Sequence, residues 1–185
     1  MKLTQTESIL CQALAMTSLL NELSNEDFLN SEYYKNLYFK DNNNNFKEIL
    51  NDSGLGNPAT IQMFLYALLV MPKEIFENSK EPYIKCLISQ VNNLFQGIVH
   101  ELETTYDKES KNDFTTINFC RHIRNAVSHS RCYYEVKDNV SYVTFEDSLP
   151  KDTKKYCKIT MKTGDVGSII GELKILIMKF LNECK

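Results

Sequence analysis

The chain has 185 residues, of which 43% are hydrophobic, and it carries a formal net charge of -3. This length and apolar content fit one domain with its own core and make a second full domain unexpected. The negative net charge excludes a protein that coats nucleic acid through bulk positive charge, so any polyanion must bind at a local patch.

The cysteines and the amino terminus indicate a cytoplasmic protein. The six cysteines are scattered without a CxxC pair, which predicts reduced thiols rather than a disulfide framework. The amino-terminal stretch is amphipathic and includes Gln12 and Asn21. No window approaches about eighteen apolar residues, so we expect neither export nor insertion into a membrane.

The first part of the chain predicts helices. Thr4 and Glu7 form a capping box before apolar residues at helical spacing, which predicts a helix that ends near Ser24. A second helical region is expected over residues 25–39. The asparagine run at residues 42–45 predicts a solvated loop.

The next segment predicts a buried helix. Asn57 and Pro58 match an N-cap followed by the first helical position, and residues 59–71 are apolar almost all the way round. Pro72 is expected to end this helix because proline cannot continue it. A short helical turn is expected at residues 73–77.

Two more helices are expected before the pattern changes. Pro82 opens a long apolar stripe that predicts a helix continuing to Leu102. A polar stretch over residues 104–112 separates it from the next helix, which Asp113 is expected to cap and which runs to about Val127.

The pattern then changes to one typical of strands. Three segments rich in aromatic and β-branched residues are 133–136, 140–145 and 156–161. Asp138 and Asn139 suit a turn, and residues 166–181 form an amphipathic helical pattern. The sequence therefore predicts a mainly α fold, with a small β-meander inserted at about residues 132–162 before the C-terminal helix.

The arginines are concentrated in a single segment. All three arginines, Arg121, Arg124 and Arg131, lie within eleven positions, and two of the three histidines, His122 and His129, lie there too. The planar and permanently charged guanidinium matches a phosphate or carboxylate with two hydrogen bonds. The segment therefore indicates a site for an oxyanion at the carboxyl end of a helix.

Within this segment Arg124, Asn125 and His129 spell RNAVSH, which resembles the RxxxxH motif of the HEPN superfamily. The stretch GNPATIQMFLYALLVMPKE and the strand-rich tail resemble a plasmid-borne prokaryotic HEPN subfamily, so the resemblance covers nearly the whole chain. It implies one HEPN-like antiparallel helical bundle over residues 1–185. It also implies a homodimer with a composite active site, and a metal-independent ribonuclease of host defence or a toxin-antitoxin system.

The same three residues suit RNA cleavage. Without a metal, this reaction needs a base for the ribose 2'-hydroxyl, an acid for the leaving 5'-oxygen and a cation near the phosphate. His129 suits proton transfer because an unperturbed imidazole titrates near pH ~6.5. Arg124 suits a bidentate grip on the phosphate, and Asn125 suits orientation of the phosphate or the histidine. The products would be a 2',3'-cyclic phosphate and a 5'-hydroxyl.

Helical geometry separates the motif residues. Positions five apart on an ideal helix differ in direction by about 140°, so Arg124 and His129 of one chain do not share a face. The site therefore needs either a helix that unwinds near Ser128 or residues from two chains. The resemblance favours two chains.

Other residues of the segment have accessory roles in this hypothesis. Arg121, Arg131 and His122 are expected to contact RNA, which the resemblance implies is single-stranded. The alternatives are a solvated basic face for the two arginines and core or surface placement for His122. No metal or cofactor is expected, because the spacing CxH followed by HxxC matches no common zinc finger. Arg131 also stands where related toxins carry a modified tyrosine, so control by tyrosine nucleotidylation is not expected.

Two questions about function stay open at this point. The resemblance implies an antitoxin or regulatory partner, which the sequence does not identify. A different class of function is a non-catalytic HEPN-like module that binds RNA or a nucleotide, or only dimerises. In that case the motif serves phosphate binding or helix packing.

Overall fold

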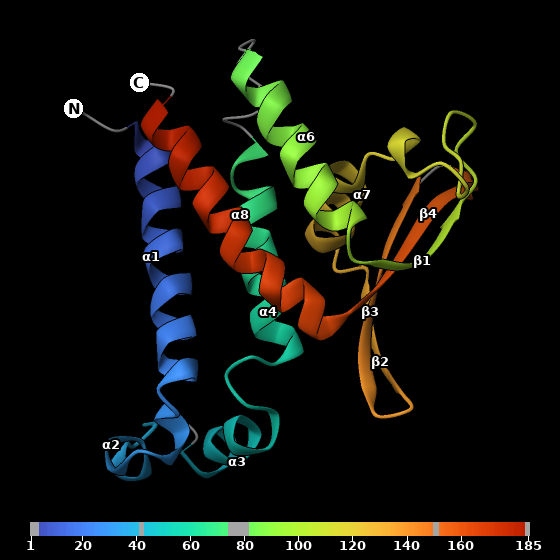
Figure 1. Ribbon diagram of the computed structural model, residues 1–185. Coiled ribbons are helices and arrows are strands. Elements are labelled where there is room, and N and C mark those ends of the chain that lie inside the picture. Colours follow the sequence, from blue (N-terminus) through green and yellow to red (C-terminus); the bar gives the residue numbers. More distant parts are fainter. Residues whose placement is uncertain (1–3, 41–42, 74–81, 150–151, 184–185) are drawn as a thin grey trace.

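Helices form most of the molecule, and a small sheet lies beside them. The computed structural model describes residues 4–40, 43–73, 82–149 and 152–183. A four-stranded antiparallel sheet lies on one side of the helices (Figure 1). The prediction of a mainly α fold is therefore confirmed. No helix within the described ranges is long and apolar enough to cross a membrane.

The first helix begins as its sequence predicts. Helix α1 (Gln5–Asn25) starts at a capping box, in which the Glu7 backbone N–H donates to the Thr4 hydroxyl over 3.2 Å. The Glu7 carboxylate accepts in return from the Thr4 backbone N–H over 2.7 Å. These bonds satisfy helix-end donors that would otherwise lack partners.

The segment after α1 differs from the prediction in two respects. Two short helices, η1 (Phe28–Asn30) and α2 (Glu32–Asn36), replace one helical region, because Ser31 between them is extended, and the left-handed Asp27, with φ of 50°, precedes η1. Helix α3 (Asn43–Ser53) begins inside the asparagine run, so the predicted loop is wrong from Asn43 onward, and Asn42 lies outside the described residues. Asparagine is favoured at helix starts as well as in loops.

The central helix starts at the predicted residues. The side chain of Asn57 caps α4 (Pro58–Leu65), which continues as a π-helical turn, η2 (Tyr66–Val70). Six of the thirteen residues of α4 and η2 are buried, but Met63 and Tyr66 are 61% and 48% exposed. The helix therefore has one solvent-facing edge, which the apolar sequence does not indicate. The turn predicted at residues 73–77 lies largely outside the described residues.

Helix α6 (Pro82–Gln96) is shorter than predicted. Residues Val99–Thr104 form strand β1, which pairs antiparallel with β4 (Asp152–Lys162). The prediction of a helix as far as Leu102 is wrong. The spacing of the apolar residues here fits a helix, but pairing along a neighbouring strand outweighs that local preference.

The predicted β-meander is present. Strands β2 (Cys132–Lys137), β3 (Val140–Leu149) and β4 follow one another, and the sheet order is β1-β4-β3-β2. Asp138 and Asn139 join β2 to β3 with φ of 50° and 60°. A two-residue hairpin turn of this twist requires positive φ at both positions, which these residue types tolerate.

The helix that carries the RNAVSH segment starts later than predicted. Asp113 caps only a short 3-10 turn, η3 (Phe114–Thr116). Asn118 caps α7 (Phe119–Ser128) by accepting a hydrogen bond from the backbone N–H at position 121 over 3.0 Å. Asp113 is therefore not the cap of α7, because a second capping residue follows it.

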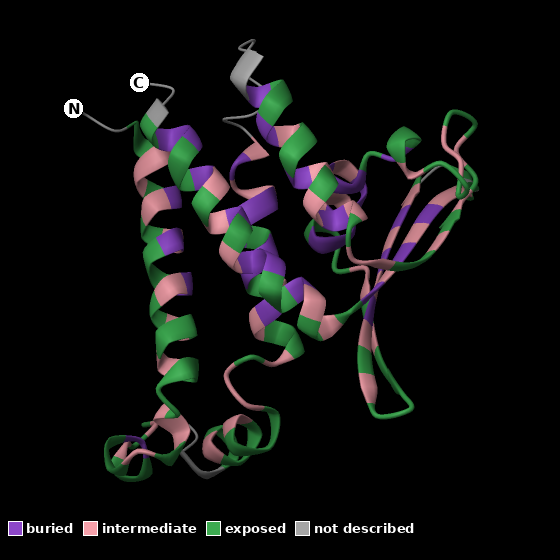
Figure 2. Ribbon diagram, in the orientation of Figure 1, coloured by how far each residue is buried: buried purple, intermediate pink, exposed green. Residues whose placement is uncertain are grey.

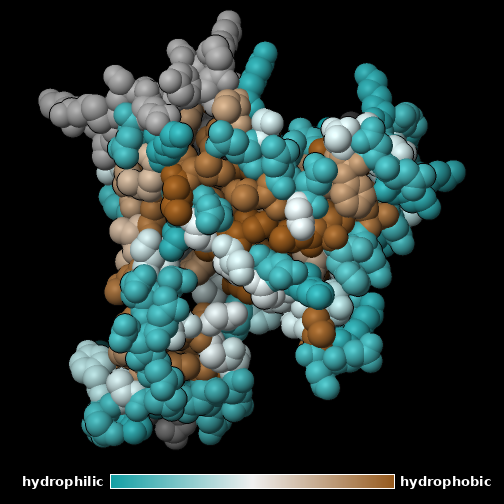
Figure 3. Space-filling view, in the orientation of Figure 1, coloured by the Kyte–Doolittle hydropathy of each residue, from teal (hydrophilic) through white to brown (hydrophobic). Residues whose placement is uncertain are grey.

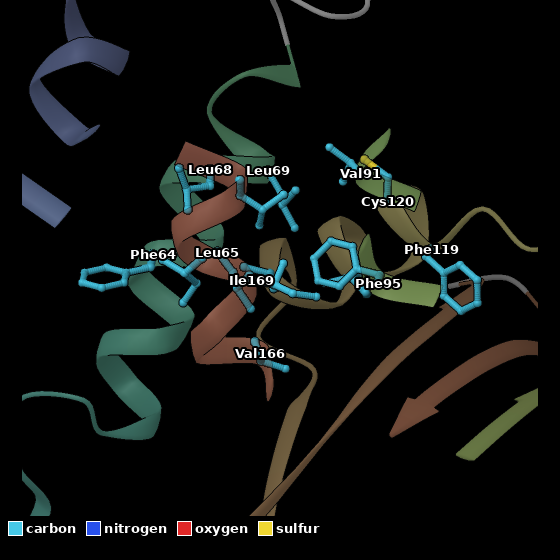
Figure 4. Close-up of a cluster of buried hydrophobic side chains, with 14 of the residues drawn as sticks. Phe64, Leu65, Leu68, Leu69, Val91, Phe95, Phe119, Cys120, Val166 and Ile169 are labelled. Atoms are coloured by element: carbon cyan, nitrogen blue, oxygen red, sulfur yellow. The ribbon is translucent and has the colours of Figure 1, made fainter. Parts of the chain in front are cut away.

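The hydrophobic core lies between α4, α6, α7 and α8 (Thr163–Glu183). In Figure 4, Phe95 of α6 and Phe119 of α7 lie on one side of Leu65 and Ile169, which come from α4 and α8. Buried residues also alternate along β3 and β4 (Figure 2). Hydrophobic residues gather in a band across the middle of the face in Figure 3. The core therefore fixes one side of α7 and leaves the other side available.

Candidate functional site

The exposed side of α7 carries the motif residues. The buried residues of α7 are Phe119, Cys120, His122, Ile123, Ala126 and Val127. Of the remaining side chains, Arg124 and Asn125 are half-buried, whereas Ser128 and His129 are exposed. Helix α7 ends at Ser128, and His129 is its exposed C-cap, whose backbone N–H donates to the Asn125 carbonyl over 3.1 Å.

Asn125 connects the motif to the sheet. Its Oδ1 accepts a hydrogen bond from Nη2 of Arg124 over 3.4 Å. Its Nδ2 donates to Oδ2 of Asp147, on strand β3, over 3.2 Å. Asn125 therefore lies between the guanidinium of Arg124 and a carboxylate, with each end of its amide facing the group that suits it.

A buried network continues from Asp147 into the protein. The His122 side chain is fully buried, with Nδ1 at 2.7 Å from Asp147 Oδ2 and Nε2 at 2.8 Å from Glu109 Oε1. Thr104 donates a further hydrogen bond to Glu109 over 2.8 Å. These distances need a proton on each ring nitrogen or on one carboxyl group. The prediction that His122 contacts RNA is therefore wrong, because the fold encloses this ring and uses both of its nitrogens.

The network changes the acidity of Asp147. Burial raises the pKa of its carboxyl group, but the hydrogen bond from His122, the charge of His122 and the hydrogen bond from Asn125 lower it by more. Arg121 adds to this lowering, and the net pKa lies below the usual value. The folded protein therefore favours the charged form of Asp147.

Three residues of this region also form a group of potential metal ligands. Among the described residues, Glu109, His122 and Cys157 each offer a ligand atom, and these atoms lie within 4.8 Å of one another. The direct hydrogen bond between Glu109 and His122 already satisfies both groups. Burial, together with the charge of Glu109, raises the pKa of the Cys157 thiol to about 12. A metal ion at this place would have to displace the proton of this thiol and the hydrogen bond between Glu109 and His122.

The other two arginines have different surroundings. The Cζ atom of Arg121 lies 5.2 Å from the ring centroid of Tyr106, in a cation-π contact. Nη1 of Arg131 donates to the carbonyl and to the hydroxyl of Ser148, over 2.8 Å in each case. Arg131 thus helps to hold β3 against the end of α7, and RNA contact by either arginine stays a prediction.

The family of the chain follows from comparison with family profiles. The profile described as HEPN pEK499 p136 matches residues 1–183. The chain belongs to this HEPN family. The match confirms the predicted resemblance over nearly the full length of the chain. Searches of curated proteins and of solved structures gave no match.

A groove lies beside the motif of this HEPN protein. It has a volume of about 300 Å³ and is formed by α4, η2 and the end of α7. Its lining residues are Ala59, Gln62, Met63, Tyr66, Val127, Ser128 and Ser130. A larger cavity of about 410 Å³ lies between α1, α4 and α8 and contains no motif residue. The smaller groove is the one next to His129.

Sequence reasoning missed two residues next to the motif in the candidate site, Asp147 and Glu109. One signal was present for Asp147, because Val143, Phe145 and Asp147 alternate on the inward face of β3 and only the last of them is charged. A charged residue at an inward position indicates a buried partner. Glu109 lies in a polar stretch, and nothing in the sequence distinguishes it.

Proposed function

We propose that this HEPN protein is a homodimeric, metal-independent endoribonuclease that cleaves single-stranded RNA. The observation that carries the proposal is the arrangement of the motif on α7. Arg124 is half-buried near the carboxyl end of α7 and His129 is the exposed C-cap of that helix, while Asn125 is hydrogen-bonded to both Arg124 and Asp147. The family match supports a HEPN domain, and the ribonuclease activity is our inference from the residues.

The proposed reaction is a transesterification. A base removes the proton from a ribose 2'-hydroxyl, and the resulting oxygen attacks the adjacent phosphorus. An acid gives a proton to the departing 5'-oxygen, which leaves a 2',3'-cyclic phosphate and a 5'-hydroxyl. His129 takes the proton-transfer role, since it is exposed at the end of α7. Arg124 binds the non-bridging phosphate oxygens, and Asn125 orients Arg124.

Two chains supply this chemistry better than one. The reaction needs separate base and acid groups, and one chain offers a single exposed histidine in the motif, His129. A twofold axis beside the end of α7 brings two copies of His129 to one phosphate, so one can act as base and the other as acid. Arg121 is proposed as a phosphate contact at the edge of this shared site.

The proposal is tested by cleavage of labelled single-stranded RNA in EDTA. We expect Arg124→Ala and His129→Ala each to reduce cleavage by about 100-fold or more. His100→Ala, which removes an exposed histidine of β1, is the matched control and should cleave at the wild-type rate. A substrate with 2'-deoxyribose at the cleaved position should resist cutting, because it lacks the attacking oxygen.

Failure of the wild-type protein to cut any RNA would contradict the proposal. Homopolymers and a mixed-sequence RNA should all be tried, since the sequence preference is unknown. The proposal would also be contradicted if Arg124→Ala and His129→Ala both cut RNA as fast as the wild type. The activity would then come from other residues or from a contaminant.

The alternative function is a module that binds RNA or a nucleotide without cleaving it. One observation favours it: Arg124 and Asn125 are hydrogen-bonded to each other within one chain, as in a motif that serves structure. Retention of RNA on the protein without any product would support this alternative. An antitoxin or regulatory partner, in host defence or a toxin-antitoxin system, belongs to the endoribonuclease proposal, because such an activity needs restraint in its host.

A further inference from the structure

One continuous line of hydrogen bonds runs from the protein interior to the motif. It begins at Glu109, passes through the His122 ring to Asp147, and continues through the Asn125 amide to the guanidinium of Arg124. The interior part is hidden from solvent, since His122 is 0% exposed and Asp147 is 6% exposed. The line ends at the residue proposed to bind phosphate.

We propose that Asp147 and His122 are positioning residues, which act through Asn125 to orient Arg124 for phosphate binding. This inference rests on the proposed ribonuclease function and deepens it. It gives the buried histidine a role other than the predicted contact with RNA.

The chemistry of the Asn125 amide supports this role. An asparagine side chain can turn its oxygen and its nitrogen end for end at little cost when its surroundings allow it. Asp147 accepts hydrogen bonds and Arg124 donates them, so only one orientation of Asn125 satisfies both neighbours. Without the carboxylate of Asp147, only Arg124 still favours one orientation of the Asn125 amide. The reversed amide would then turn its N–H groups toward the guanidinium of Arg124.

His122 fixes Asp147 in turn. One oxygen of Asp147, Oδ2, accepts from both His122 and Asn125, over 2.7 Å and 3.2 Å. Hydrogen bonds in a low-dielectric interior are strong, and they leave a carboxylate with few alternative arrangements. The position of this oxygen therefore sets the position of the Asn125 amide.

Stability alone is a weak explanation for the network. A buried arrangement of two carboxylates and one imidazole loses much hydration energy, and apolar residues of similar size are often equally or more stabilising. Position 147 continues an inward series of apolar residues, Val143 and Phe145, so an apolar side chain would suit the core there. A charged group in this place, bonded to the polar residue of the motif, indicates a role in the site.

The test compares single and double variants in RNA cleavage. We expect Asp147→Asn to reduce kcat by about 100-fold, a loss typical of misplaced catalytic groups, while KM changes by less than about threefold. Asn125→Ala should reduce kcat similarly. If Asp147 acts through Asn125, the double variant is no slower than Asn125→Ala alone. Independent losses that multiply in the double variant would overturn the proposal.

A matched control lies next to Asp147 on the same strand. The carboxylate of Glu146 pairs with Lys158 at 3.4 Å, on the opposite face of the sheet. Glu146→Gln should therefore leave kcat unchanged. If Asp147→Asn does not fold, Glu109→Gln replaces it, because it weakens the network at its far end. A fall in kcat of about tenfold is then expected, and an unchanged kcat would overturn the proposal.

A second measurement does not depend on cleavage. The side-chain amide protons of Asn125, observed by NMR in ¹⁵N-labelled protein, should exchange slowly with water in the wild type and rapidly in Asp147→Asn. Equal exchange in both proteins would overturn the positioning role. The positioning role would also be overturned if purified wild-type protein contained one equivalent of zinc and Glu109→Gln contained none, because the cluster would then bind a metal. If the wild-type protein cuts no RNA, the proposed ribonuclease function is wrong. The exchange rates of the Asn125 amide protons still show whether Asp147 orients Asn125.

Discussion

The substitution His122→Ala provides a direct test of the buried network. The ring is fully buried and lies within 2.8 Å of a Glu109 oxygen and 2.7 Å of an Asp147 oxygen. Its removal leaves two buried carboxyl groups without their shared partner, together with a cavity. His129→Ala, on the exposed end of the same helix, is the matched control.

The expected loss of stability is large for one residue. Removal of one partner from a buried ionic pair costs about 3–5 kcal/mol, against a total stability of about 5–15 kcal/mol for a typical domain. In a protein of 185 residues, each kcal/mol lowers the melting temperature by roughly 2–4 °C. His122→Ala should therefore melt about 6–20 °C below the wild type. His129→Ala should change the stability by less than about 0.5 kcal/mol.

The loss of stability in His122→Ala should depend on pH, and the direction of this dependence follows from the pKa of Asp147. Its pKa in the folded protein is lowered, so this carboxylate stabilises the fold above its unfolded pKa of about 3.9, and the contribution is lost as pH falls through the folded value. In His122→Ala the carboxyl group stays buried without its partner, and its pKa rises. The variant therefore gains stability relative to the wild type as pH decreases.

Thermal unfolding followed by circular dichroism tests both expectations. The difference between wild type and His122→Ala should be largest near about pH 7 and should shrink toward about pH 4. A melting temperature for His122→Ala within about 3 °C of that of His129→Ala would refute the reasoning, because the network would then contribute little. A difference that grows in acid would contradict the assigned charge of Asp147.

Two further predictions concern the site itself. First, a tenfold excess of His129→Ala chains, mixed with wild-type chains and allowed to exchange, should lower cleavage per wild-type chain by about tenfold, because a mixed dimer holds a single His129. Unchanged cleavage per wild-type chain, once exchange is verified, would mean that one chain supplies the whole site. Second, Arg121→Ala should lower the dependence of RNA affinity on salt, with a change in slope of about 0.7, as for one lost phosphate contact. Arg131→Ala should also destabilise the fold, by about 1–3 kcal/mol, because its guanidinium donates to the carbonyl and the hydroxyl of Ser148.

Local signals predicted most of the fold. The capping box at Thr4, the Asn57 cap and the hairpin turn at Asp138 depend on residue chemistry within a few positions, and all three are present. The helix predicted as far as Leu102 was wrong because distant pairing decides the structure there. Residues Val99–Thr104 have helical spacing, yet they join β4, more than fifty positions later in the chain. Local spacing carries no information about that partner.

The same distinction applies to the site. The RxxxxH spacing is local, so the sequence alone identified Arg124 and His129 as candidates. The network is not local, because Glu109 and Asp147 lie 13 and 25 positions from His122 and meet it only through the loop after β1 and the register of β3. The sequence showed two histidines seven positions apart, and the fold gives them opposite environments.

The three arginines illustrate why a cluster of charge in sequence is not yet a binding site. Arg131 is bonded to the sheet and Arg121 lies over an aromatic ring, so each has a contact within the fold. Arg124 is connected to the buried network, through Asn125. Its Nη2 donates to Oδ1 of Asn125, and Nδ2 of Asn125 donates to the buried carboxylate of Asp147. A flexible arginine loses side-chain entropy when it grips a phosphate, and a guanidinium that is already oriented loses less. The buried network therefore bears on how well Arg124 stabilises the phosphate in the transition state, although no atom of His122 is accessible to RNA in this chain.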